Sequence, residues 1–190
     1  MLEAILTLDS SILLWIQDFL RNDLLSAFFT TYTHLADNGE LWIAVCVLFL
    51  LFRKTRPAGI VGLLSLLTAH LVNTELLKNI IARPRPFTRL EELECLIKQP
   101  SSYSFPSGHS SASFAAAGAW LQTLSGEKWM APFKVLAVIM ALLMAFSRLY
   151  VGVHYPTDVI AGSLMGFLAS VVVTRIYRKV SYRLSYRPHR

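Results

Sequence analysis

The sequence predicts an all-α protein, an integral membrane bundle of about six helices that forms one domain over residues 1–190. Apolar residues make up 54% of the chain, and the mean hydropathy is +0.49. These residues are gathered in long blocks between short polar stretches, which is typical of membrane-spanning helices. The basic residues are clustered as well, since six of the eighteen lie between Arg175 and Arg190.

The N-terminal apolar stretch, residues 4–20, is interrupted by Asp9 and Asp18. This pattern is typical of an amphipathic helix at the membrane surface, which we place at residues 1–22. The alternative is that the stretch forms the first half of a tilted span. Residues 24–36 are too short to cross alone, since a crossing helix needs about 20 apolar residues. Joined to the preceding helix, they would cross once.

The rest of the chain divides at polar stretches. A turn signal, Asp-Asn-Gly-Glu, occupies residues 37–40. The long polar loop at residues 82–106 and the basic tail at residues 175–190 are the other main breaks. The apolar segments between these breaks are residues 41–52, 58–81, 107–124, 135–153 and 156–174.

The positive charges predict an orientation. The positive-inside rule places the basic stretch at residues 53–56 on the cytoplasmic side. Following the segments in order then places loop 82–106 outside the cell membrane and the tail 175–190 in the cytoplasm. A clumped basic tail fits an anionic lipid surface better than nucleic acid, so we expect the bilayer and no nucleic acid as partners.

The stretch Ser147–Asp158 carries an Arg, a His and an Asp between two apolar runs. Such groups are costly near a bilayer and therefore indicate a functional site. If Pro156 opens a helix, Asp158 lies in its first turn and can reach back to the His154 ring. A carboxylate on one ring nitrogen makes the other a better base or nucleophile. Arg148 offers a planar fork suited to phosphate, so we expect His154 to be the nucleophile of a phosphate site.

A second stretch, residues 78–86, ends an apolar segment with Lys78, Arg83 and Arg85. This concentration of positive charge beside hydrocarbon would suit an anionic substrate. The alternative is that these side chains extend to the interface and contact lipid headgroups.

A third stretch, Pro-Ser-Gly-His at residues 106–109, precedes an apolar run. Backbone N–H groups at a helix N-terminus bind anions, and Gly108 would let a phosphate approach the backbone closely. His109 is then placed to donate a proton to a leaving oxygen. The alternative is an ordinary helix cap with an interfacial histidine.

The three stretches occur in the order Lys-x6-Arg-Pro, Pro-Ser-Gly-His and Ser-Arg-x5-His-x3-Asp. This set resembles the type 2 phosphatidic acid phosphatase superfamily, whose membrane branch has six helices. The resemblance covers residues 39–174. Arg83 also precedes a proline, but it lies two residues too close to Lys78, so we leave it as an auxiliary charge.

The resemblance implies a role for each signature residue. His154 would attack phosphorus to give a phosphohistidine, Asp158 would orient His154, and His109 would protonate the leaving group and then activate water. The residues that would hold the phosphoryl oxygens are Lys78, Arg85, Ser107, Gly108 and Arg148. Phosphoryl transfer needs mostly positioning and electrostatic stabilisation, so we expect no metal and no cofactor.

We therefore expect a lipid phosphatase with an outward-facing site. Undecaprenyl diphosphate is the favoured substrate, and phosphatidic acid or phosphatidylglycerophosphate is the alternative. A vanadate-dependent haloperoxidase would use the same residues, but the apolar segments argue against that generally soluble branch. A non-catalytic membrane protein is a third possibility, which the intact set of charged residues disfavours.

Overall fold

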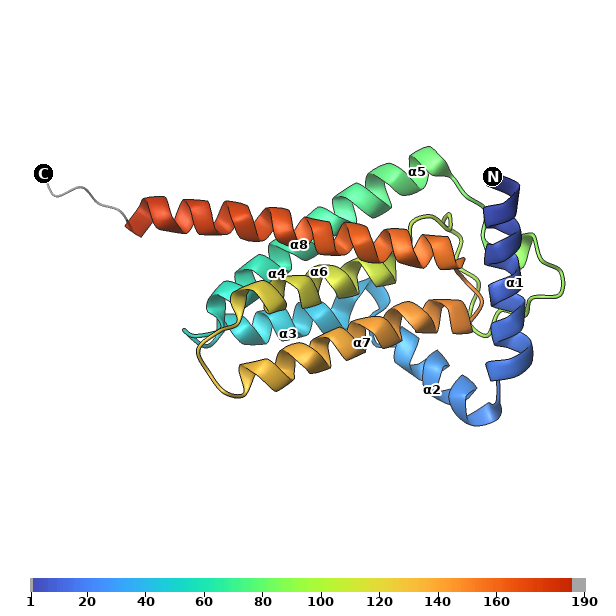
Figure 1. Cartoon of the computed structure of the whole chain (residues 1–190), viewed down its shortest axis with the longest axis horizontal. Helices are drawn as coiled ribbons and strands as arrows, with labels where there is room; N and C mark the ends of the chain where they lie inside the picture. The colour runs from blue at the N-terminus through green and yellow to red at the C-terminus, as the bar shows by residue number, and fades with distance from the viewer. Residues whose placement is uncertain (1, 186–190) are drawn as a thin grey trace, which may run out of the picture.

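The computed structural model describes residues 2–185, and every regular element in this range is a helix, which confirms the predicted all-α fold class (Figure 1). Three short elements, η1 (Asp37–Gly39), η2 (Leu71–Leu77) and η3 (Pro86–Thr88), are a 3-10 turn, a π-helical stretch and a second 3-10 turn. The α-helices are α1 (Leu2–Leu20), α2 (Asp23–His34), α3 (Glu40–Leu50), α4 (Arg56–His70), α5 (Lys78–Ile81), α6 (Gly108–Thr123), α7 (Met130–Tyr150) and α8 (Pro156–Ser185).

The longer helices run roughly along one axis, with α6 among α4, α7 and α8 (Figure 1). Four predicted segments have clear counterparts in the structure. Segment 58–81 corresponds to the run from α4 to α5, and segments 107–124, 135–153 and 156–174 correspond to α6, α7 and α8, respectively. Within residues 2–185, three helical stretches are long and apolar enough to cross a membrane. They are Arg56–Thr88, Met130–Tyr150 and Pro156–Leu184.

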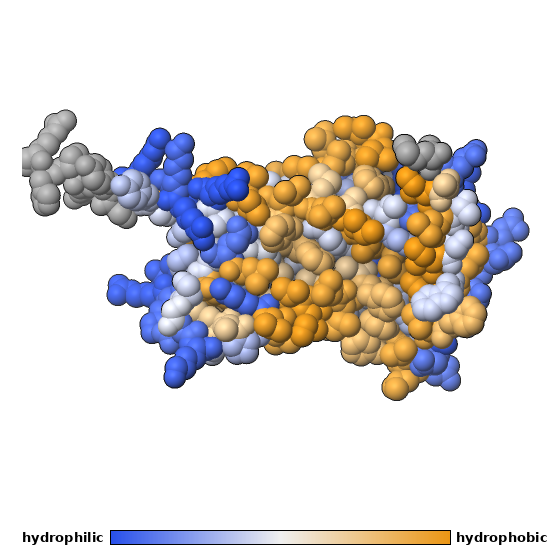
Figure 2. All heavy atoms as spheres, viewed as in Figure 1, coloured by the Kyte–Doolittle hydropathy of each residue, from blue (hydrophilic) through white to orange (hydrophobic). Residues whose placement is uncertain are grey.

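The surface agrees with a membrane environment. Figure 2 shows apolar side chains over the middle of the bundle and hydrophilic ones gathered toward its two ends. An exposed apolar band of this kind is expected where lipid tails replace water. The basic residues of α8 lie at the end of the bundle opposite α1 (Figure 1). The last five residues of the predicted tail, 186–190, lie outside the described residues.

The first crossing differs from the prediction. The α3 helix has 11 residues, about 16 Å in length, which is too short to cross alone. Figure 1 shows α3 continuing from α2 toward the opposite end of the bundle, so the turn signal at residues 37–40 interrupts a crossing without reversing the chain. Asn38 and Gly39 have φ angles of 55° and 78° at this interruption. The two helices together reach about 34 Å, enough for the hydrocarbon layer.

The N-terminal helix α1 lies across one end of the bundle (Figure 1). The chain bends at Arg21 and Asn22, so α1 and α2 do not form one straight span. The guanidinium of Arg21 donates hydrogen bonds of 3.1 and 2.9 Å to the Tyr150 carbonyl, which holds this bend against the end of α7. One face of α1 buries Leu13 and Ile16. This placement agrees with the interfacial interpretation of residues 1–22, which stays a prediction.

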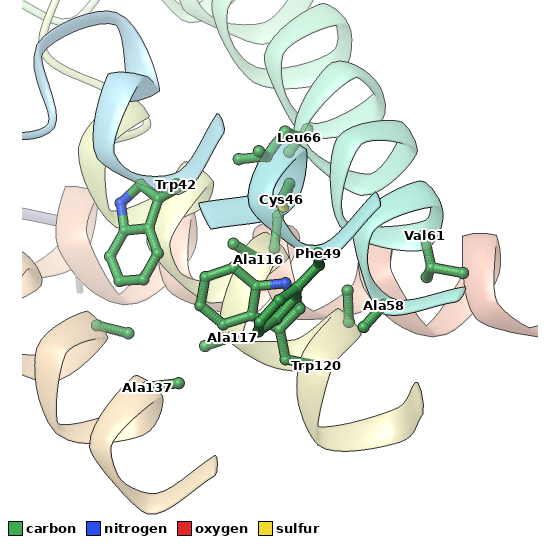
Figure 3. Packing of buried hydrophobic residues seen from close by; sticks show 14 of the residues in the cluster. Trp42, Cys46, Phe49, Ala58, Val61, Leu66, Ala116, Ala117, Trp120 and Ala137 are labelled. Carbon is green, nitrogen blue, oxygen red and sulfur yellow. The ribbon is translucent and has the colours of Figure 1, made fainter. Parts of the chain in front are cut away.

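The main apolar core lies between α3, α4, α6 and α7. Figure 3 shows Trp42, Cys46 and Phe49 of α3 against Trp120 of α6. The ring centroids of Trp42 and Phe49 lie 5.8 and 5.5 Å from that of Trp120. These large side chains fit because the other buried residues of α6 are all small, namely alanine, serine and glycine.

Small residues bring α6 and α8 into close contact, as membrane helices require when dispersion and hydrogen bonds hold them together. A Cβ added at Gly162 would collide with the Ser107 carbonyl oxygen, and one added at Gly166 with the Ser111 carbonyl oxygen. The glycines therefore set the separation between the start of α6 and the first turns of α8.

We expect Gly166→Ala to destabilise the protein by about 1–3 kcal/mol, because the added methyl group must push two helix backbones apart. A lower melting temperature in detergent would report this. The matched control is Leu168→Ala, which changes the exposed face of the same helix. Equal melting temperatures for Gly166→Ala and the native protein would show that the helices are not held at this distance.

Candidate active site

One cavity of about 1120 Å³ brings the three motifs together. Its walls come from loop 82–106, η1, α4 and the start of α6. Six of the eight predicted site residues line it, namely Lys78, Arg85, Gly108, His109, Arg148 and His154. The other two, Ser107 and Asp158, are fully buried behind this lining.

The corner between α7 and α8 positions His154 and Asp158. The corner turns at Gly152, whose φ angle of 79° suits glycine, and Pro156 then opens α8. Asp158 lies in the first turn, where its Oδ2 accepts a 2.9 Å hydrogen bond from the Tyr155 N–H. The same oxygen lies 3.5 Å from His154 Nδ1. The carboxylate therefore reaches back to the ring as the spacing predicted.

The hydrogen-bond partners decide which tautomer His154 adopts. Its Nε2 lies 3.4 Å from Nη1 of Arg85, and a guanidinium can only donate. The lone pair is therefore on Nε2, and the proton is on Nδ1, next to Asp158 and the Ser104 hydroxyl. The pKa of His154 is lowered to about 3, mainly by burial and also by Arg85 and Arg148, against the opposing effect of Asp158. The ring is neutral at physiological pH, as a nucleophile requires.

Ser104 is a contributor that the sequence did not indicate. This fully buried residue donates a short hydrogen bond to Asp158 Oδ2, and its hydroxyl oxygen lies 3.4 Å from His154 Nδ1. It lies within loop 82–106, in a stretch without any recognisable motif. Only the folding of loop 82–106 over the corner brings it to the pair.

Arg83, which its spacing from Lys78 left as an auxiliary charge, pairs directly with the site carboxylate Asp158. Its Nη1 lies 2.6 Å from Asp158 Oδ1, and its Nη2 lies 2.7 Å from Asp9 Oδ2 on α1. The guanidinium also stacks on the Tyr155 ring, 3.9 Å from its centroid. Arg83 therefore balances the charge of the buried Asp158 and does not line the cavity. Its partner Asp9 lies 74 residues away in the chain, which is why the sequence alone gave no sign of the pairing.

Three buried cations face the cavity. Arg85 is held by hydrogen bonds to the Ser102 and Val153 carbonyl oxygens, at 2.7 and 2.9 Å. Arg148 is 3% exposed and donates from Nη1 to the Thr33 hydroxyl at 2.5 Å, while its Nε has no partner in the described residues. Lys78 begins α5 and is also buried.

None of these three cations forms an ion pair with a carboxylate within residues 2–185. Glu75, three residues before Lys78, contacts His70 instead, at 3.4 Å. Buried positive charges without partners are costly, so a site of this kind is suited to an anion with several oxygens.

The start of α6 supplies the third motif. Ser107 is the N-cap of the helix, and its hydroxyl accepts from the Ser110 N–H at 3.4 Å. The Ser107 N–H donates to the Asp158 carbonyl at 3.0 Å, which joins the start of α6 to α8. Gly108 lines the cavity, whereas the Ser107 hydroxyl is turned into the cap. Direct contact between this hydroxyl and a phosphate stays a prediction.

His109 has a carboxylate partner of its own. Its Nε2 lies 3.1 Å from Asp37 Oδ1, and Asp37 Oδ2 lies 2.8 Å from His34 Nδ1. The sequence interpretation assigned Asp37 only to a turn. The interruption between α2 and α3 brings this residue beside the start of α6.

Residues 58–182 match the model of the PAP2 superfamily, and this range contains all three motifs. The chain belongs to the PAP2 superfamily. The resemblance inferred from the motifs is thereby confirmed.

Two relatives of this PAP2 chain are named as phosphatases. It is 40% identical over 136 residues to the undecaprenyl-diphosphatase of Sulfolobus acidocaldarius, a match that covers 72% of this chain and 63% of that relative. It is 33% identical over 171 residues to phosphatidylglycerophosphatase B of Bacillus subtilis, covering 85% and 79%. The chain thus spans slightly less than two thirds of the Sulfolobus relative and about four fifths of the Bacillus one. Their names agree with the predicted enzyme class.

A solved membrane protein shares the fold. The crystal structure of a transmembrane PAP2 type phosphatidylglycerolphosphate phosphatase from Bacillus subtilis superposes with a TM-score of 0.77 at 29% identity. The superposition covers 93% of this chain and 88% of that one. Together with the apolar helices, it confirms the prediction of a multi-pass membrane protein.

The lowered pKa of His154 predicts acid sensitivity. The folded value is about 3 and the ordinary value is 6.5, so the unfolded chain binds more protons between these values and stability falls as the pH falls. From pH 7 to pH 5 this effect amounts to about 2 kcal/mol. We expect the melting temperature of the native protein to fall more steeply over this range than that of His154→Gln, which has no titrating ring. Equal slopes would contradict a neutral buried imidazole.

Proposed function

We propose that this protein is an integral membrane phosphatase that cleaves a lipid phosphate or diphosphate through a phosphohistidine intermediate. The observation that carries the proposal is the cavity itself, where three buried cations without carboxylate partners surround two histidines. The unpartnered Nε of Arg148 supports it further, because a buried guanidinium ordinarily uses its donors.

The first chemical step would begin at His154. Its Nε2 lone pair attacks phosphorus as the bond from phosphorus to the leaving oxygen breaks, and His109 gives that oxygen a proton. Asp158 stabilises the positive charge that the His154 ring acquires. Lys78, Arg85 and Arg148 would stabilise the charge on the equatorial oxygens.

The second step would release phosphate. A water molecule attacks phosphorus, the bond to His154 Nε2 breaks, and the neutral ring of His109 takes the proton of the water. His154 returns to its starting tautomer because Asp158 and Ser104 still hold Nδ1. We propose no metal in this cycle, since three cations and the start of α6 can supply the charge stabilisation. Within residues 2–185, no group of three or more His, Cys, Asp and Glu residues is arranged to bind one.

The shape of the cavity supports a lipid substrate. Its polar part lies at Lys78 and Arg148, and its walls also include Ile43 and Leu67, which are half-exposed apolar residues of α3 and α4. A headgroup would fill the polar part, while the hydrocarbon tail would leave between these helices into the bilayer. The exposed apolar band argues against the haloperoxidase alternative, because that chemistry needs no membrane.

Undecaprenyl diphosphate is the substrate we favour. The relative from Sulfolobus acidocaldarius is named for it, and the site would accommodate the charge of a diphosphate. Phosphatidylglycerophosphate is the second candidate, supported by the name of the Bacillus subtilis relative and by the structural neighbour from that organism.

The experiment is phosphate release by the purified protein from a panel of lipid phosphates, which includes these two and phosphatidic acid. We expect hydrolysis of undecaprenyl diphosphate, and a loss of at least about 10⁴-fold in His154→Ala because the nucleophile is absent. A sample of the native protein quenched in alkaline detergent, in which the phosphorus–nitrogen bond is stable, should contain a phosphohistidine. The control is Lys128→Ala, at the opposite end of the bundle. Substantial turnover by His154→Ala would exclude the nucleophile, and inactivity on the whole panel would exclude the function.

We also propose that the site faces outside and that the C-terminus is cytoplasmic. Apart from the residues assigned to the site, the basic clusters lie at the end of the bundle away from α1, as the positive-inside rule requires of the cytoplasmic end.

A cysteine introduced at exposed Glu91 of loop 82–106 should react with an impermeant thiol reagent in intact cells, in a Cys95→Ser background. A cysteine at exposed Lys128 should react only after the membrane is opened. The reverse labelling pattern would overturn the orientation.

A further inference from the structure

Asp37 stands out because it opposes the charge of its surroundings. It is the only carboxylate among the described residues that line the cavity, whereas Lys78, Lys98, Arg85 and Arg148 line it as cations. A negative charge in such a place repels an anionic substrate and weakens its binding. A carboxylate at this position therefore needs a role in the reaction whose benefit outweighs the weaker substrate binding.

The contacts of Asp37 indicate what this role is. Its two oxygens are divided between two rings, with Oδ1 at 3.1 Å from His109 Nε2 and Oδ2 at 2.8 Å from His34 Nδ1. The contact with His34 fixes the carboxylate from one side. On the other side, His109 Nε2 is occupied, and no hydrogen bond joins His109 Nδ1 to the protein in the described residues.

The backbone is built to place this carboxylate. Asp37 belongs to the η1 interruption between α2 and α3 and not to either helix. The interruption at Asn38 and Gly39 is formed by the two residue types that tolerate positive φ most readily. The η1 turn then packs against α6, directly beside His109.

We propose that Asp37 is a positioning residue that holds His109 as the proton donor and acceptor of the reaction, as Asp158 holds His154. This proposal rests on the proposed function. The bond to Asp37 keeps a proton on His109 Nε2 and turns Nδ1 toward the substrate. The imidazolium gives its Nδ1 proton to the leaving oxygen as the bond to phosphorus breaks. The neutral ring then takes a proton from water at Nδ1 as the phosphohistidine is cleaved.

The role predicts a dependence on the leaving group. An alkoxide or phosphate leaving group needs a proton as it departs, whereas p-nitrophenolate is stable without one. A defect in the proton donor therefore slows phosphohistidine formation from a lipid phosphate and leaves its formation from p-nitrophenyl phosphate nearly unchanged. A residue that only supports the fold would slow both.

The experiment measures phosphohistidine formation with both substrates by rapid quench in alkaline detergent, in which the phosphorus–nitrogen bond is stable. For Asp37→Asn we expect a loss of about 10²-fold with the lipid phosphate, the lower range for a general acid, and a loss below about threefold with p-nitrophenyl phosphate. Asp37→Glu should recover part of the loss, and KM should change far less than kcat. His109→Ala should show the same pattern, and combining it with Asp37→Asn should add little further loss.

The matched control is Asp23→Asn, a carboxylate exposed in the first turn of α2, for which both rates should be native. Equal losses of Asp37→Asn with the two substrates, or a native rate with the lipid phosphate, would overturn the proposal. Either result leaves the proposed function standing as long as His154→Ala is inactive. Activity of His154→Ala would instead refute the proposed function.

Discussion

The buried carboxylate of Asp158 is the interaction on which the rest of the site depends. It contacts His154, the Ser104 hydroxyl, the Tyr155 N–H and the Arg83 guanidinium, and so joins the corner, loop 82–106 and α8. An ionised carboxylate is stable in a low-dielectric interior only when such partners satisfy it. Arg83 extends the network to Asp9, which ties the N-terminal helix to the same group. Satisfying one charge therefore fixes several elements of the bundle around the proposed nucleophile.

The cavity beside this network shows the opposite arrangement. Lys78, Arg85 and Arg148 are buried without a carboxylate partner, and their positive charges repel one another. The fold tolerates this because Arg85 donates hydrogen bonds to the Ser102 and Val153 carbonyl oxygens, and Arg148 donates one to the Thr33 hydroxyl. The structure thus stores an unfavourable charge distribution that an anionic ligand would relieve.

Several features were predictable from the sequence because they depend on local spacing. The apolar blocks determine the helices, and the i, i+4 spacing of His154 and Asp158 places the carboxylate near the ring once Pro156 begins a helix. The motif order allowed the PAP2 family to be inferred, and the family match confirmed it. Each of these inferences uses residues that are neighbours in the chain or a pattern that survives without coordinates.

Other features were decided only by the tertiary structure. The pairing of Arg83 with Asp9 spans 74 residues, and that of His109 with Asp37 spans 72. No spacing rule connects residues so far apart, because their distance depends on how whole helices pack. The broken crossing of α2 and α3 is a similar case, since a turn signal is the same whether the chain reverses or continues. The sequence by itself determined the helices, the family and the identity of the charged residues. Packing decided which charges are paired and which are left for a ligand, because burial and partnership are properties of three-dimensional contact.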